Sequence, residues 1–315
     1  TTGIPVEVGS ALTAAAIVFL ALTGGLFSVA YTDAVSALLI LFGLTVGLPF
    51  ALSAAGGPGF FGDLPPLKLT WSGGLTGPQL VGYFFPVLVL LLGEQNMYQR
   101  FAAARDSETA RRSAMGFLLG AVVVLTLVTL VTTTAVILYP GITPDTALLR
   151  VALDAMPFAV GAPLLAAAVA FIVTTGDSYL LSCSTNVTHD FWVRFVDPGA
   201  SQARRLWITR GVVLLLGVVA WVLGTFFPSV LAIQMYSYTM YGAAITPAVL
   251  AAFLWKGATA AGGVASILLG GGGTLLWELV LDKPGDLNSV VFSLPLSVAA
   301  LVVVSLATGA RRGGR

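Results

Sequence analysis

The chain has 315 residues, of which 57% are hydrophobic and only 9% are charged. A mean hydropathy of +0.95 and so few charges exclude an ordinary soluble domain, because such domains carry about 25% charged residues. The formal net charge of +1 gives no reason to expect a nucleic acid or another acidic partner. We therefore expect an all-α integral membrane protein in contact with a lipid bilayer.

Nine apolar stretches are long enough to cross a bilayer as helices, which takes about 20 residues each. The connections between them are short except for the Gly/Pro-rich stretch 54–78, which we interpret as an ordered external loop rather than a domain boundary. The sequence therefore predicts a single transmembrane domain over residues 1–315. The predicted spans are 6–28, 33–53, 79–97, 114–140, 158–187, 206–227, 230–254, 259–281 and 289–309.

The first ten residues, TTGIPVEVGS, contain no initiator methionine and lack the basic and apolar regions of a signal peptide. We interpret the chain as a fragment of a longer protein that lacks its N-terminal helices.

The basic residues fall mostly on one side of the nine-span arrangement. An excess of Lys and Arg marks the cytoplasmic side of a membrane protein. The sequence thus predicts a multi-pass protein of the plasma (inner) membrane, with the first residue of the chain outside and its C-terminus in the cytoplasm. Three basic residues lie on the outer side, Lys68, Arg150 and Lys283, and twelve on the inner side: Arg100, Arg105, Arg111, Arg112, Arg194, Arg204, Arg205, Arg210, Lys256, Arg311, Arg312 and Arg315.

Asp33, in the stretch VAYTDAV, lies at the predicted start of the second span, near the inner face. One interpretation is that Thr32 and Asp33 cap the first turn of the helix. The other is that the carboxylate serves an ion, because ionisable groups in membrane spans are costly and commonly functional. The residues alone leave both open.

The third span reads QLVGYFFPVLVLLLGEQNMYQR, with Pro86 inside it and a polar break at residues 93–96 near its inner end. Discontinuous helices free backbone groups that can bind substrate or ions. Alternatively, Glu94 and Gln95 already lie at the level of the lipid headgroups, beside Arg100.

The fifth span contains the stretch FIVTTGDSYLLSCSTN, residues 171–186, which is unusually polar for a membrane segment. Thr174 and Ser178 are four residues apart and Thr175 and Ser178 are three apart, so their hydroxyls share one helical face. Hydroxyl and carbonyl oxygens are hard ligands that suit sodium, and Asp177 adds a negative charge. The simpler alternative is that these hydroxyls bond to their own helix or to neighbouring helices.

One cysteine and one histidine are present in the chain. A single cysteine excludes an intramolecular disulfide, and we expect Cys183 to be a buried small residue. His189 lies far toward the inner end of the fifth span, which disfavours a transition-metal site.

The seventh span carries a row of polar and aromatic residues that includes Gln234, Tyr236 and Tyr238. These residues can form part of the aromatic belt at the membrane interface. They can equally line a cavity that opens to the outside.

Four stretches resemble the sodium:solute symporter family, which contains proline, pantothenate, sialic acid, sugar and iodide cotransporters. The stretches are GGLFSVAYTDAVSALLILFG (24–43), QNMYQRFAAARDSETARR (95–112), TTGDSYLLSCSTNVTHDF (174–191) and ITPAVLAAFLWKGATAAGG (245–263). The resemblance implies the five-plus-five inverted-repeat transporter fold, in which the first and sixth core helices are broken. The nine spans would then be core helices four to ten and two further helices, with the first three core helices missing.

The resemblance also implies roles for individual residues. The adjacent hydroxyls that bind the coupling sodium in the family fall on Thr174 and Thr175, and a backbone carbonyl ligand falls on Phe171. The acidic residue of the family's TD motif falls on Asp33, which in members with a second sodium faces the positions of Asp177 and Ser178. Carboxylates at both positions can hold a second sodium, or one of them can be protonated.

By the same resemblance, the sixth core helix contributes to the substrate site and falls on the third span here. Its candidate lining residues are the apolar Val87 and Leu90, with Glu94 and Gln95 further in; from the seventh span we add Gln234 and Tyr238. The apolar lining disfavours a sugar and favours a solute with an apolar body, such as a monocarboxylate, an amino acid or a pantothenate-like acid.

The resulting hypothesis is a sodium-coupled symporter that imports a small organic solute by alternating access, with no other cofactor and no obligate protein partner. A transporter-like sensor module of a signalling protein and a proton-coupled carrier that uses Asp33 or Asp177 are the alternatives. We do not expect an enzyme, because the sequence contains no recognisable catalytic triad, phosphate-binding loop or metal cluster.

Overall fold

The computed structural model describes residues 5–23, 26–227 and 229–309, and for residues 26–29 only the backbone. The regular structure of these residues is entirely helical. Nine of the described helices are long and apolar enough to cross a membrane, which confirms the number and order of the predicted spans. They are Val6–Thr23, Ala30–Ala54, Gly77–Ala102, Ser107–Leu138, Phe158–Val196, Gln202–Gly224, Val230–Leu254, Ala260–Val280 and Val290–Gly309.

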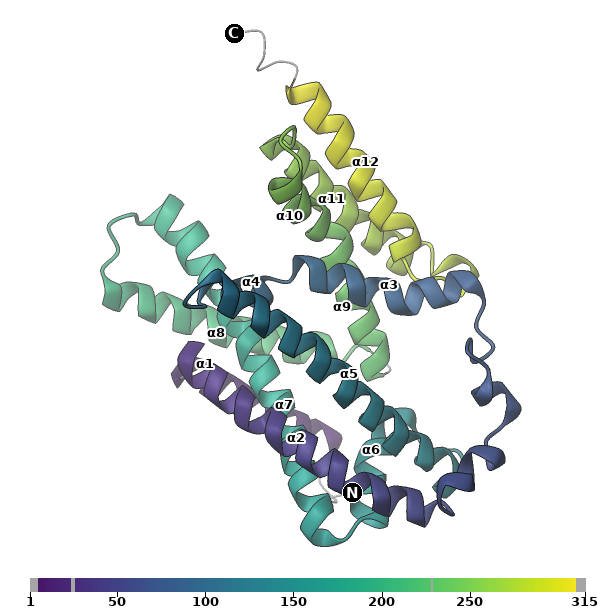
Figure 1. Cartoon of the computed structure of the whole chain (residues 1–315). Coiled ribbons are helices and arrows are strands. Elements are labelled where there is room, and N and C mark those ends of the chain that lie inside the picture. The colour runs from purple at the N-terminus through teal and green to yellow at the C-terminus, as the bar shows by residue number, and fades with distance from the viewer. Residues whose placement is uncertain (1–4, 24–25, 228, 310–315) are drawn as a thin grey trace. The chain divides into compact units, whose positions relative to one another are not determined.

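The chain divides into two compact units, each of which is described by itself. Unit 1 contains residues 1–64 and 100–227, and unit 2 contains residues 65–99 and 228–315. The first division lies inside the long connection 54–78, between Leu64 and Pro65. In Figure 1, unit 1 is coloured from purple to teal, and unit 2 comprises the blue helix of residues 77–93 and the green to yellow helices near the end of the chain.

Unit 1 is built from five long helices and several short turns. The long helices are α1 (Val6–Thr23), α2 (Leu26–Ala54), α5 (Ser107–Leu138), α7 (Phe158–Thr185) and α8 (Gln202–Gly224). The short elements are η1 (Pro58–Asp63), η3 (Pro144–Thr146), α6 (Ala147–Arg150) and the π-helical turns η4 (Val151–Ala155) and η5 (Asn186–Val196).

The core of unit 1 lies where α2 packs against α5 and α7. Leu44 and Val131 are fully buried there, and Leu164 is almost fully buried. Gly43 allows the close approach, since a Cβ at this position would lie 2.9 Å from the Cβ of Leu164. This contact holds α7, the helix with the most polar face in the unit, in a defined register against α2.

The fourth span begins earlier than the expected residue 114, because the polar stretch before it also folds as helix. Asp106 caps α5 by accepting a hydrogen bond from the backbone N–H of Thr109 at 2.7 Å. Glu108 then pairs with Arg111 and Arg112 one turn further on. A capped start and ion pairs at helical spacing favour helix even where the residues are exposed.

Asp106→Ala should lower the thermal unfolding temperature at pH 7 by removing this cap. The backbone hydrogen bond from Thr109 holds the pKa of the Asp106 carboxyl below its usual range. A depressed folded-state pKa contributes stability above the unfolded pKa of about 3.9, and this stability is lost as the pH falls through the folded value. The difference between variant and wild type should therefore shrink toward acidic pH. Asp106→Asn, which keeps an acceptor but does not titrate, is the control.

Unit 2 is built from α3 (Gly77–Gly93), α9 (Val230–Ala244), α10 (Thr246–Leu254), α11 (Ala260–Leu275) and α12 (Val290–Gly309). Its shorter elements are η2 (Pro66–Leu69), the π-helical turn η6 (Leu276–Val280) and η7 (Pro284–Asp286). The short helix α4 (Gln95–Ala102) crosses from unit 2 into unit 1 at Arg100.

Small residues form the packed interface between α11 and α12. The hydroxyls of Ser266 and Ser297 are 2.8 Å apart, and both side chains are fully buried. Gly262 faces Ser305 so closely that a Cβ would collide with its hydroxyl. Glycine and serine at helix interfaces are typical of membrane proteins, because they let backbones approach and satisfy polar groups between helices.

The seventh predicted span, 230–254, is broken in the structure. Helix α9 ends at Ala244, and α10 begins at Thr246 after Ile245. Pro247 explains the break, because it has no N–H to donate to the carbonyl four residues earlier and is well placed in the first turn of a new helix.

Candidate functional site

The polar residues of the fifth span lie on the buried face of α7. Thr174, Asp177 and Ser178 are all at least nine-tenths buried, whereas Thr175 is half-buried. Gly176 lies between Thr175 and Asp177 and allows α1 to pack closely against α7, since a Cβ there would lie 2.9 Å from the side chain of Ile17. The sequence TTGDS therefore combines a polar face with a close helix contact one residue away.

Two oxygens of the predicted sodium site are already adjacent. The Thr174 hydroxyl lies 3.3 Å from the carbonyl oxygen of Phe171, to which it donates a hydrogen bond. A hard cation about 2.4 Å from each oxygen could contact both at this separation. The Phe171 side chain is 54% exposed, so only its backbone belongs to this cluster.

Ser178 continues the cluster one turn further along α7. Its hydroxyl donates to the carbonyl oxygen of Thr174 at 2.8 Å. Like the bond from Thr174 to Phe171, this is a bond to its own helix of the kind that the simpler interpretation predicts. The neighbouring Asp177 is different: the side chain is 4% exposed, and its Oδ1 atom has no hydrogen-bond partner. A buried carboxylate oxygen without a donor is costly, and such atoms call for an explanation, which can be an ion or a proton.

Asp33 lies inside α2, which begins at Leu26, so the interpretation of Thr32 and Asp33 as a helix cap is wrong. The helical run starts earlier because the apolar residues before Asp33 continue it. The Asp33 carboxylate pairs instead with Arg100, whose Nη2 atom is 2.7 Å from Oδ2. The same Nη2 atom lies 3.4 Å from the hydroxyl of Ser178.

Arg100 is the site residue that reasoning from the sequence missed. The sequence indicates only an inner-side charge that can lie beside Glu94 and Gln95, yet Arg100 joins Asp33 of α2 to Ser178 of α7. One signal could have revealed it, since a carboxylate in a membrane span requires a partner. Arg100 also follows the polar break at residues 93–96 within two turns of helix.

Cys183 is exposed rather than buried, contrary to expectation. It lies on the face of α7 opposite the polar cluster, where it lines an apolar groove of about 620 Å³ with Ile17, Leu180 and Leu216. The prediction failed because small size indicates tolerance of burial, whereas the direction of the side chain depends on which face of α7 meets α2.

The polar break in the third span is confirmed in unit 2. Helix α3 ends at Gly93, and Glu94 has the extended backbone angles φ −69° and ψ 119° before α4 begins. Three hydroxyls satisfy carbonyls near the break: Thr246 bonds to Val89 at 2.8 Å, Tyr98 to Leu92 at 2.8 Å and Tyr241 to Gly93 at 3.2 Å. Tyr241 also accepts the backbone N–H of Gln95 at 3.2 Å, so its hydroxyl bridges the break.

The candidate substrate-lining residues all belong to unit 2, whereas the predicted ion ligands all belong to unit 1. Leu90 is buried, and Val87, Glu94, Gln95 and Tyr238 are half-buried. Gln234 is exposed. Their role in binding a solute stays a prediction.

Comparisons with known proteins agree on one family. A family model described as "Sodium:solute symporter family" matches residues 1–270. The sodium/proline symporter of Salmonella typhimurium is 27% identical over 308 residues, which cover 89% of this chain and 61% of that protein. The osmoregulated proline transporter OpuE of Bacillus subtilis is 26% identical over 318 residues, which cover 97% of this chain and 64% of that protein.

A solved structure supports the fold. A Na⁺-coupled sialic acid symporter in a substrate-bound outward-open state matches 97% of this chain and 68% of that chain, with a TM-score of 0.75 and 18% identity. The likeness confirms the transporter fold expected from the resemblance. The chain spans only about three-fifths of the curated relatives described above, 61% and 64% of their lengths.

Proposed function

Because this chain belongs to the sodium:solute symporter family, we propose that it forms the larger part of a sodium-coupled carrier that imports a small organic solute. Residues 1–315 would act as one transmembrane transport domain in the plasma (inner) membrane. The distribution of Lys and Arg supports an arrangement with the first residue outside and the C-terminus in the cytoplasm.

The observation that carries the proposal is the cluster of oxygens on the buried face of α7. Thr174 contributes a buried hydroxyl 3.3 Å from the Phe171 carbonyl, and Thr175 adds a second hydroxyl one residue on. We assign sodium to these three residues, since hydroxyl and carbonyl oxygens are its preferred ligands.

Sodium at this position would favour the outward-open state of the carrier and raise its affinity for solute. Coupling between two ligands is reciprocal, so solute must raise the affinity for sodium by the same factor. Because the fifth span runs from outside to inside, the site lies toward its cytoplasmic half, and inward opening would release sodium first.

Among the solutes considered, the proposal favours an amino acid. Both curated relatives described above are named as proline transporters, and proline has an apolar ring and a carboxylate. Leu90 and Val87 offer apolar surface on α3, and the broken helix at Glu94 and Gln95 offers backbone polar groups beside it.

A second candidate coupling ion is favoured by one observation. The unpartnered Oδ1 atom of buried Asp177 supports a second cation or a proton shared among Asp177, Asp33 and Ser178. Solute uptake measured at fixed sodium concentration across a range of pH separates the two. Proton coupling predicts uptake that follows the proton gradient, and a second sodium predicts a Hill coefficient for sodium above one.

Sodium binding to the intact protein tests the main proposal. Thr174→Ala/Thr175→Ala should weaken binding of radioactive sodium by at least about 100-fold, because the variant removes two interactions of a polar group with a charge, each worth about 1.5–3 kcal/mol. Thr185→Ala is the matched control, since the Thr185 hydroxyl on the same helix only bonds to the carbonyl of Leu181. Equal binding by the double variant and the control would refute the assignment.

A further inference from the structure

A polar cavity of about 240 Å³ lies within unit 2, apart from the residues assigned above. The first turns of α3 and α9 form two of its walls, with Gln79, Tyr83 and Tyr236, and the connection between η6 and α12 forms the third. All three segments stand at the end of unit 2 that the Lys and Arg distribution assigns to the outside. The cavity is smaller than the roughly 300–1,000 Å³ pockets of drug-sized ligands, so it suits a small solute.

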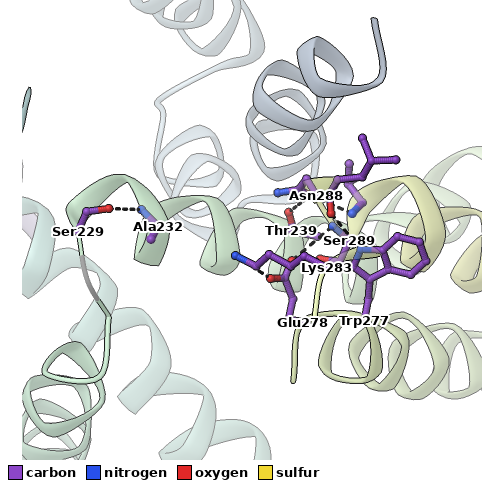
Figure 2. A network of polar contacts seen from close by, with 10 residues as sticks. Ser229, Ala232, Thr239, Trp277, Glu278, Lys283, Asn288 and Ser289 are labelled. Carbon is purple, nitrogen blue, oxygen red and sulfur yellow. Dashed lines mark hydrogen bonds and ion pairs between the residues drawn. The ribbon is translucent and has the colours of Figure 1, made fainter. Parts of the chain in front are cut away.

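The third wall is held by a buried carboxylate. Only 6% of the Glu278 side chain is exposed, and its Oε1 atom accepts the Ser289 hydroxyl at 2.7 Å. Its Oε2 atom lies 3.2 Å from the Nζ atom of Lys283. Figure 2 shows these three side chains together, with Lys283 reaching back over Glu278.

Three further hydrogen bonds fix the same connection. The side-chain Oδ1 atom of Asn288 accepts the Thr239 hydroxyl of α9 at 2.8 Å, as Figure 2 shows, and it also accepts the backbone N–H of Val290 at 2.9 Å. The indole N–H of Trp277 donates to the carbonyl of Leu287 at 2.9 Å. The wall is therefore preorganised, which lowers the entropic cost of binding a ligand.

The backbone of this connection is strained between Glu278 and Asn288, the residues whose contacts fix it. Asp282, Lys283 and Asp286 have positive φ angles of 50°, 51° and 54°. Residues other than glycine seldom adopt this left-handed region, and such strain persists mainly where the surroundings enforce it, often at binding sites. The strained conformation places Lys283 and Asp286 on the same cavity.

Charges of both signs therefore line one small space. The Lys283 side chain is 49% exposed, and its ammonium group carries three donors and lies 3.2 Å from the Oε2 atom of Glu278. Asp286 is exposed at the cavity and carries the opposite charge. Glu278 leaves Lys283 donors that a ligand carboxylate can use, and Asp286 can accept a ligand ammonium group, so a ligand with both charges uses both residues and a ligand with a single charge uses only one.

We propose that this cavity binds a small zwitterionic amino acid, with its carboxylate on Lys283 and its ammonium group on Asp286. Only the orientation toward the outside rests on the proposed function. The binding itself does not, because none of the predicted sodium ligands takes part in it.

The proposal is tested by binding to the intact protein in potassium buffer without sodium. The probes are L-proline, pyrrolidine and cyclopentanecarboxylate, which share a five-membered ring and carry both charges, the positive charge or the negative charge. L-Proline should bind at least about tenfold more tightly than either comparator, since one charged interaction contributes about 1.5–3 kcal/mol. Equal binding of cyclopentanecarboxylate would overturn recognition of a zwitterion, and absence of L-proline binding would overturn the site.

Variants assign the binding to this cavity. Lys283→Met alone would leave the Glu278 carboxylate buried and unpaired, so the test uses Glu278→Gln/Lys283→Met, which keeps an acceptor for Ser289. We expect this variant and Asp286→Asn each to weaken L-proline binding by about tenfold or more. Asn tolerates the left-handed backbone at residue 286, so Asp286→Asn reports on charge even if the double variant folds poorly.

Two controls separate the possible outcomes. Lys256→Met removes an exposed cation of the same unit that does not line the cavity, and it should leave binding unchanged. Thr174→Ala/Thr175→Ala should lose sodium binding but keep sodium-free binding of L-proline, so a failure of the sodium site and a failure of this cavity are distinguishable. Unchanged binding in both cavity variants would overturn the proposal.

Discussion

Asp33→Ala should lower solute uptake by the intact carrier by at least about tenfold. The carboxylate of Asp33 holds the Arg100 guanidinium at 2.7 Å, and the same guanidinium lies 3.4 Å from Ser178. Without Asp33, Arg100 keeps its positive charge beside the α7 oxygens. A cation there repels sodium, because like charges at short range are disfavoured most where solvent is scarce.

The neutral double variant tests whether the free charge causes this loss. Asp33→Ala/Arg100→Ala removes both charges, so it should recover sodium-dependent uptake relative to Asp33→Ala alone. The measurement is initial uptake of labelled L-proline at several sodium concentrations. An equal defect in the single and double variants would contradict a role for Arg100 and leave the Asp33 carboxylate itself as the required group.

An exposed ion pair provides the control for this experiment. Glu108 and Arg112 pair at 2.8 Å on the surface of α5, where the two side chains are 49% and 78% exposed. Exposed pairs contribute about 0–1 kcal/mol. Glu108→Ala should therefore leave uptake close to wild type. The Asp33–Arg100 pair is itself about one-third exposed, so we expect its loss to affect function more than stability.

Gly270→Ala should destabilise the protein far more than Gly272→Ala, although the two glycines are two residues apart on α11. A Cβ at Gly270 would lie 2.8 Å from the carbonyl carbon of Ala243 and 3.0 Å from the Cα of Ala244. Both atoms belong to the backbone of α9, so neither can move aside as a flexible side chain would. Overpacking of this kind costs about 1–3 kcal/mol and sometimes more.

Gly272 is the matched control, because a Cβ there would meet nothing within 4 Å. Alanine also favours helix over glycine by about 1 kcal/mol, so Gly272→Ala should be neutral or slightly stabilising. The measurement is the thermal unfolding temperature of each variant in the same detergent. Similar unfolding temperatures for the two variants would show that α9 and α11 do not pack as closely as described.

Several features of the fold follow from sequence because they depend on neighbours along the chain. Apolar runs of sufficient length identify nine spans, and the polar residues after Gly93 identify the break before α4. The helical spacing of Thr174 and Ser178 places them on one face, which the structure buries. Local composition and periodicity suffice for these features, since a lipid environment requires helices whose backbone bonds are satisfied within the segment.

Other features depended on residues far apart in the chain. Arg100 looks like one more inner-side charge until α2 and α7 bring Asp33 and Ser178 to it. The sequence from Leu276 to Val290 does not by itself indicate a cavity. The cavity wall depends on contacts between distant residues, such as that of Asn288 with Thr239, which are 49 positions apart. The exposure of Cys183 likewise followed from which face of α7 packs on α2.

Composition, apolar run length and motifs are enough to predict that this protein is helical, lies in a membrane, has nine spans and resembles one transporter family. These properties follow from the transfer of apolar side chains out of water and from motifs within single helices. The packing of the helices determines which charges pair, which glycines allow a neighbouring helix to approach and which residues line one cavity, as Lys283 and Asp286 do. Charge pairing and steric contact act over a few ångströms in space, and distance along the chain does not determine distance in the fold.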